Sequence, residues 1–174
     1  MTDRFAHRLK LDQVRDGERV EIAADEAERR SIAERLGLSG LDCLQAHATL
    51  TRKGALIEAD GRIVASLEQS CVVTGVAVPS HVDEPFSLIF MPELEVGRSD
   101  EEVELGPADC DVVFYDGTTI DFGAAIADTL ALSLDPYPRS AGADAALKEA
   151  GILSEAEAGP FAALAQLKKG SDIP

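Results

Sequence analysis

The chain has 174 residues, of which 45% are hydrophobic and 28% charged, so it can bury the core of one ordinary domain or two small ones. Asp and Glu number 32 against 16 Lys and Arg, which gives a net charge of −16 at pH 7. This balance argues against a wide nucleic-acid surface and against an anionic membrane, because both are bound through Lys and Arg. It permits binding to a basic partner.

The sequence lacks features that would direct the protein to a membrane or out of the cell. No apolar run reaches the length of a membrane span, and the N-terminal residues lack the apolar segment of a signal peptide. The cysteines, Cys43, Cys71 and Cys110, are far apart and odd in number, which fits a reducing compartment. We therefore expect a cytoplasmic protein that makes no membrane contact.

The first predicted elements are a helix and a strand. Residues 25–36 are expected to form a helix, because Asp25 can cap it, Glu28 stands where a capping box needs an acid, and Gly37 can end it. Apolar and polar side chains then alternate over residues 44–51. That alternation predicts a half-buried strand with one polar face.

More β structure is predicted as far as residue 91. An Asp-Gly pair at residues 60–61 stands between two strand-like runs and predicts a hairpin turn. A Thr-Gly pair at 74–75 predicts a bend, and Pro79 and Pro85 predict strand ends or edge strands. The expected product is an antiparallel sheet of about four or five strands.

The next segment changes character. Residues 92–110 are acidic and contain Gly and Pro, so we expect a mobile surface loop. Asp116 and Gly117 predict a tight turn. Asp121 is expected to cap a helix over 121–134, whose apolar residues recur four apart and form one stripe.

Two shorter helices are predicted in the Ala-rich C-terminal part, around residues 143–150 and 160–169. The expected fold class is therefore α+β: an antiparallel β-sheet, open or barrel-like, with an N-terminal helix and two or three C-terminal helices. Residues 1–140 are expected to form a single α+β domain. Residues 141–174 are expected to form a helical extension that is either packed on this domain or partly mobile.

Catalytic chemistry has little support in the sequence. There is no GxSxG, GxGxxG or Walker A motif, and no pair of Cys or His has metal-ligand spacing. Asp116 and Asp121 are the best candidates for an enzyme, a divalent-cation-dependent hydrolase or nuclease, because carboxylate oxygens suit magnesium. Turn formation and helix capping already explain both residues. We expect no catalytic residue, no cofactor and no metal, with the hydrolase as the alternative.

Four segments in a fixed order carry a family resemblance. A Cys-containing region (VASLEQSCVVTGVAVP) over 64–79 is followed by an F-x-L-x-F-x-P run over 86–92. A pattern that begins D-G-x-x-I-D-F and ends P-Y-P spans 116–138, and P-F-A-x-L-x-x-L-K spans 160–168. In this order the chain resembles the bacterial YceD family, named for accumulation of the large-subunit ribosomal RNA, over most of residues 60–169.

The resemblance implies a non-catalytic factor in ribosome biogenesis that supports accumulation or processing of large-subunit ribosomal RNA. Together with the negative charge, this leads us to expect contacts with a ribosomal protein or a pre-ribosomal particle, and any RNA contact is expected to be indirect. The residues that we expect to bind the partner lie in the matching motifs: Asp116, Gly117, Asp121, Pro160, Phe161, Leu164 and Lys168.

The chain departs from the family at one place. Many members carry Cys-x-x-Cys in the central strand region, whereas here Cys71 matches the first position and Thr74 replaces the second. The sequence after Pro138 contains no Cys. The resemblance therefore gives no support to a metal at this place in this chain.

Overall fold

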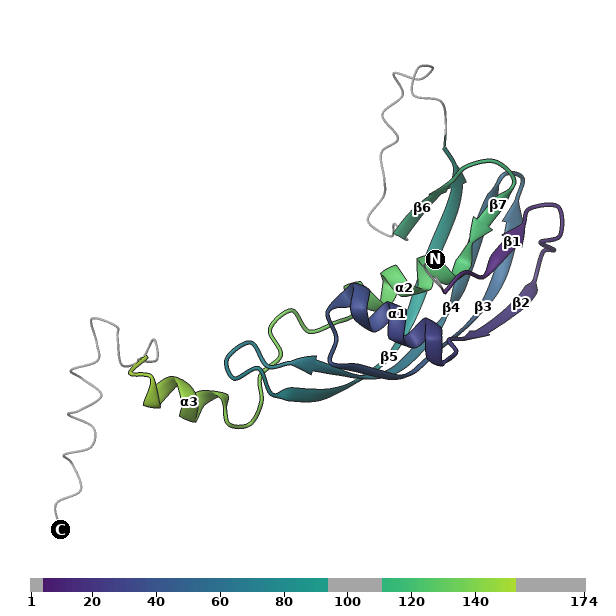
Figure 1. Cartoon of the computed structure of the whole chain (residues 1–174). Helices are drawn as coiled ribbons and strands as arrows, with labels where there is room; N and C mark the ends of the chain where they lie inside the picture. The colour runs from purple at the N-terminus through teal and green to yellow at the C-terminus, as the bar shows by residue number, and fades with distance from the viewer. Residues whose placement is uncertain (1–4, 94–110, 153–174) are drawn as a thin grey trace, which may run out of the picture. The chain divides into compact units, whose positions relative to one another are not determined.

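The computed structural model describes residues 5–93 and 111–152, which Figure 1 shows as a coloured ribbon. The elements follow in the order β1 (Arg8–Lys10), β2 (Glu18–Ala23), α1 (Glu26–Leu36), β3 (Gly40–Lys53), β4 (Leu56–Ser70), β5 (Ala77–Pro92), β6 (Asp111–Tyr115), β7 (Thr119–Asp121), α2 (Phe122–Leu132) and α3 (Ala143–Glu149). The predicted α+β class is confirmed. The helix predicted over 160–169 lies outside the described residues, as does the acidic loop apart from residues 92 and 93.

Helix α1 begins and ends where the sequence predicts. The Asp25 carboxylate accepts a hydrogen bond from the Glu28 N–H, and the Glu28 carboxylate accepts one from the Asp25 N–H, each at 2.8 Å. This reciprocal pair is a capping box. Gly37 ends the helix with φ 65°, a left-handed conformation that suits glycine. Ile32 is the residue that the helix buries.

The main sheet has five strands in the order β2-β3-β4-β5-β6. Strands β2, β3 and β4 pair antiparallel as predicted, whereas β6 lies parallel to β5. A parallel pair needs a long connection, and residues 93–110 supply it. Within the described residues the sheet is open, with β2 and β6 at its edges, so it does not close into a barrel.

The turn between β3 and β4 is not where the sequence predicted it. It lies at Gly54, which has φ 69°, and β4 runs through residues 60–61 without a break. Gly61 pairs with Ala48, and a Cβ atom placed on it would lie 2.0 Å from the His47 carbonyl oxygen. This glycine therefore permits the close approach of two strands instead of forming a turn.

Strand β5 continues past both of its internal prolines. The sequence predicted strand ends or edge positions at Pro79 and Pro85. β6 pairs only with the last part of β5, from Leu88 to Pro92, so both prolines lie on a stretch that β6 does not cover. Proline has no N–H to donate and is tolerated on such an edge. The edge interpretation is confirmed, and the predicted interruption is wrong.

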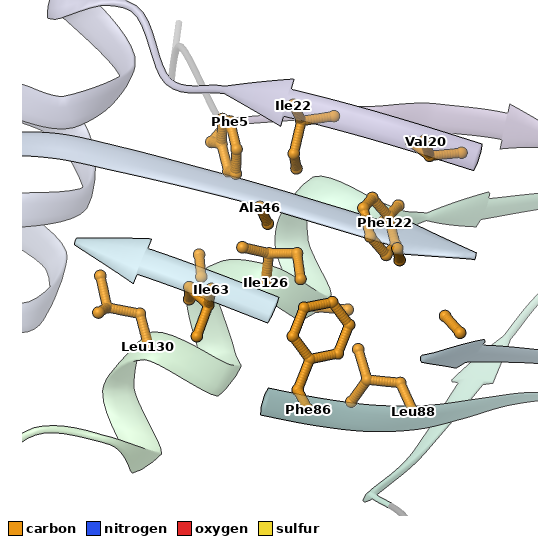
Figure 2. Packing of buried hydrophobic residues seen from close by; sticks show 14 of the residues in the cluster. Phe5, Val20, Ile22, Ala46, Ile63, Phe86, Leu88, Phe122, Ile126 and Leu130 are labelled. Carbon is orange, nitrogen blue, oxygen red and sulfur yellow. The ribbon is translucent and has the colours of Figure 1, made fainter. Parts of the chain in front are cut away.

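Helix α2 fills the core against one face of the main sheet, as Figure 2 shows. Phe122, Ile126 and Leu130 form the predicted stripe and are fully buried. The ring of Phe122 lies 6.4 Å from that of Phe86 and 6.5 Å from that of Phe90. A small second sheet, in which β1 pairs antiparallel with β7, leads directly into α2.

Two compact units divide the chain. The first comprises residues 1–69 and 79–136 and contains α1, α2 and both sheets, apart from Ser70 of β4 and residues 77–78 of β5. The second comprises residues 70–78 and 137–174, and its described part holds a turn and the predicted short helix α3. The division predicted from sequence, after residue 140, stays a prediction.

Candidate partner-binding surface

The first group of predicted partner residues surrounds the short strand β7. Gly117 has φ 74°, so the turn between β6 and β7 requires a residue without a side chain. Asp116 precedes it at the end of β6 and is exposed. Ile120, in the middle of β7, is fully buried and anchors the turn to the core. The predicted tight turn is confirmed, and it presents a carboxylate to solvent.

Asp121 has two local contacts. Its Oδ1 accepts a hydrogen bond from the Ala124 N–H at 3.0 Å, which caps α2 as predicted. Its Oδ2 lies 3.7 Å from Nε of Arg8, the residue that pairs with it across β1 and β7. Both oxygens of this carboxylate therefore serve the junction of β7, α2 and β1.

No metal-binding cluster is present among the described residues. Across residues 5–93 and 111–152, no three His, Cys, Asp or Glu side chains gather in a way that would hold a metal ion. Four further partner residues of the prediction lie outside the described ranges, and their role stays a prediction: Pro160, Phe161, Leu164 and Lys168.

The outer face of the main sheet, which points away from α2, is polar over β3, β4 and the first part of β5. Arg62 donates to the Asp83 carboxylate, which lowers the pKa of Asp83 and raises that of Arg62. Ser87 donates to the Asp60 carboxylate at 2.6 Å. Charges and hydroxyls on this part of the face therefore satisfy one another.

The same face becomes apolar over the end of β5 and β6. Their parallel register places Ile89 beside Val112 and Met91 beside Phe114. Among the residues that alternate with these four, Leu88, Phe90 and Tyr115 belong to the core and Val113 packs against it, so the four themselves point away from it. Phe114 is 65% exposed, and the other three are half-buried. We call these four residues the apolar strip.

Acidic residues flank the strands that carry the apolar strip. Asp111 opens β6, while Glu93 and Asp116 follow the ends of β5 and β6, and all three are exposed. The Glu93 N–H donates to the Tyr115 carbonyl at 2.9 Å, which holds the two strand ends together. This surface was not predicted, because an apolar run over 112–115 does not reveal which of its residues face outward.

In the described part of the second unit, the sulfur of Cys71 accepts hydrogen bonds from two backbone amides. Cys71 is buried, and its sulfur accepts hydrogen bonds from the Ser140 N–H at 3.2 Å and the Thr74 N–H at 3.5 Å. Hydrogen bonding from Ser140 and Thr74 lowers the pKa of Cys71 to about 6. The hydroxyls of Thr74 and Ser140 lie 3.2 Å apart. Thr74 thus supports the sulfur through its backbone at the position where the family resemblance implies a second cysteine.

Comparison with known proteins gives one match. The family whose sequence model matches is described as large ribosomal RNA subunit accumulation protein YceD, and the match covers residues 59–168, more than half of the chain. The chain belongs to the YceD family. The matched range includes the apolar strip, β7 and α2. Searches of curated proteins and of solved structures found no match.

The family assignment confirms the resemblance seen in the sequence. The family description names a role in accumulation of large-subunit ribosomal RNA. In the part of this YceD-family chain that the structure describes, no helix has the length and apolarity needed to cross a membrane.

Proposed function

We propose that this YceD-family chain supports accumulation of large-subunit ribosomal RNA as a non-catalytic cytoplasmic factor that binds a basic ribosomal protein or a pre-ribosomal particle. The observation that carries the proposal is the twofold excess of acidic over basic side chains, 32 against 16, in a member of this family. Proteins that contact RNA are rich in Lys and Arg. An acidic surface attracts such proteins and speeds their association.

The distribution of charge supports a cationic partner. Six ion pairs of the described residues each engage one basic side chain: Arg8, Arg30, Arg35, Lys53, Arg62 and Arg139. Because acids outnumber bases in the chain, this pairing leaves an excess of negative charge toward solvent. RNA phosphates are repelled by that excess, so we expect contact with RNA to be made through the protein partner.

The experiment combines deletion of the gene with affinity purification of the full chain. We expect the deletion strain to contain less mature large-subunit ribosomal RNA, and a plasmid copy to restore it. Purification at low salt should recover large-subunit proteins, and recovery should fall at moderate salt because exposed charges are screened over about 8–10 Å. Bound protein should persist after ribonuclease treatment.

Two results would contradict this proposal. Normal levels of precursor and mature large-subunit RNA in the deletion strain would remove the role in accumulation. Recovery of large-subunit proteins that disappears after ribonuclease treatment would show that the chain holds RNA directly, and not a protein.

A further inference from the structure

We infer that the apolar strip together with the free edge of β6 is a docking site for an extended, basic protein segment, which adds to the main sheet as a further strand beside β6. This inference rests on the proposed function, because it names the surface that grips the cationic partner. It comes from the register of β5 and β6, the exposure of Phe114 and the acids at the strand ends.

The edge of the sheet supplies the backbone part of the site. Strand β6 has β5 on one side, and the described residues provide no strand on the other side. Edge strands present N–H and C=O groups that pair readily with another extended chain. Peptides bound in this way gain affinity from the backbone and specificity from alternate side chains.

The apolar strip supplies the side-chain part. Phe114 lies on the edge strand itself and is 65% exposed, although large apolar side chains are usually buried. Val112 lies two residues before it on the same face, and Ile89 and Met91 extend the patch onto β5. A segment added beside β6 would lay every second side chain against Val112 and Phe114.

The acidic ends define the charge of the occupant. Asp111 stands at one end of β6, and Glu93 and Asp116 stand at the other. None of these carboxylates takes part in an ion pair of the described residues. An apolar segment flanked by Lys or Arg satisfies both the strip and its ends, whereas an RNA strand would bring phosphates against carboxylates.

The same charges disfavour two other occupants. A second copy of this chain, paired antiparallel through β6, would place Asp111 of one copy near Asp116 of the other, and like charges on adjacent strands repel. Residues 94–110 of the chain itself carry six acids and one base, Arg98, so their sequence lacks the positive charge that the acidic ends favour.

Site-specific cross-linking tests the inference in the full chain. A photoreactive benzoylphenylalanine replaces Phe114 in cells, and the same residue replaces Leu132 as a control. Leu132 is also strongly exposed, at 75%, but lies on α2. We expect cross-links from position 114, and not from 132, to a Lys- or Arg-rich peptide of a large-subunit protein. The triple variant Glu93→Gln, Asp111→Asn, Asp116→Asn should lower the yield at least about fivefold.

Other cross-linked products would overturn the inference. These are RNA, a second copy of the chain, a segment of the chain itself, or a peptide without excess positive charge. The absence of any product from position 114 would also overturn it.

A paired variant separates this inference from the proposed function. The partner protein identified by cross-linking is purified, and its affinity for each variant is measured. Phe114→Ser should weaken this binding about tenfold, while Leu132→Ser leaves it unchanged. If Phe114→Ser binds as the parent does and still restores ribosomal RNA in the deletion strain, the docking site is wrong and the proposed function stands. If deletion has no effect on the RNA, the proposed function fails whatever position 114 contacts.

Discussion

Different kinds of interaction stabilise the interior of each of the two compact units of this chain. In the first unit, both sheets and two helices bury one continuous apolar cluster around Phe122, Ile126 and Leu130. In the described part of the second unit, burial is sparse. Hydrogen bonds between Cys71 and its neighbours close the turn, and the Ser140 N–H donates to the Cys71 sulfur. Apolar burial is cumulative and tolerant of surface change, whereas a small hydrogen-bond network depends on each member.

This difference explains which parts of the chain tolerate substitutions. The outer face of the main sheet can carry exposed apolar residues, because the stability of the first unit comes from its opposite face. The described part of the second unit has few buried apolar residues, so the hydrogen bonds to the Cys71 sulfur contribute more to its local structure.

We expect the largest effect from a substitution at the centre of the apolar cluster. Phe122→Ala should lower the free energy of unfolding by about 3–5 kcal/mol, because it removes a fully buried ring and leaves a cavity. Urea unfolding followed by circular dichroism measures the change. Phe114→Ala is the matched control, since that ring is exposed, and it should change stability by less than about 0.5 kcal/mol. Equal losses for both variants would contradict the asymmetry between the two faces.

A smaller effect is expected at the junction of β7 and α2. Asp121→Ala should lower the free energy of unfolding by about 1 kcal/mol, because the cap to the Ala124 N–H is lost. Asp121→Asn keeps an oxygen acceptor and should stay close to the parent in stability. Urea unfolding of the two variants measures the difference.

The same pair of variants bears on the hydrolase alternative. If residue 121 serves only as a helix cap, the Asp121→Asn variant should restore ribosomal RNA in the deletion strain. If its carboxylate binds a catalytic cation, the amide cannot replace it and the variant should fail. A folded Asp121→Asn protein that fails to complement would favour the enzyme.

The smallest expected effect is a local one in the second unit. The pKa of Cys71 falls from the ordinary value of 9.0 to about 6 on folding, so the thiolate favours the folded form. This contribution is complete above pH 9.0 and is lost as the pH falls through about 6. The Ser140 and Thr74 amide protons, which donate to the sulfur, should show a titration near pH 6 by NMR.

The control for this titration is Cys71→Ser, which removes the ionisable group and should abolish the inflection at both amides. An inflection that persists in this variant would assign the change to another group. Amide signals of β3 and β4 should be insensitive over the same range, because the first unit does not rest on the sulfur.

Local signals in the sequence predicted the local structure well. The capping box of Asp25 and Glu28, the stripe of α2 and the turn at Gly117 all depend on residues within a few positions of one another. These particular signals act through nearby backbone groups, which is why the local sequence was enough to predict them. The helix around 143–150 was found in the same way.

Predictions failed where distant residues decide. An Asp-Gly pair usually makes a hairpin, but Gly61 faces the backbone of β3, and only the β3–β4 register reveals that. The apolar strip was missed for the same reason, because which side of β6 faces solvent depends on its pairing with β5. The partners of the Cys71 sulfur include Ser140, which is 69 positions away in sequence.

The parallel pairing of β5 and β6 also bears on the order in which the chain folds. Strands β3 and β4 begin to pair at Lys53 and Leu56, close neighbours in sequence, whereas β6 must return across residues 93–110 before it meets β5. Contacts between near neighbours form sooner, since less chain entropy is lost in closing them. We therefore expect β6 to join the sheet late, which pulse-labelled hydrogen exchange of its amides can follow. If a protein partner docks beside β6 as we propose, it would find this edge of the sheet formed only on a chain that has completed its folding.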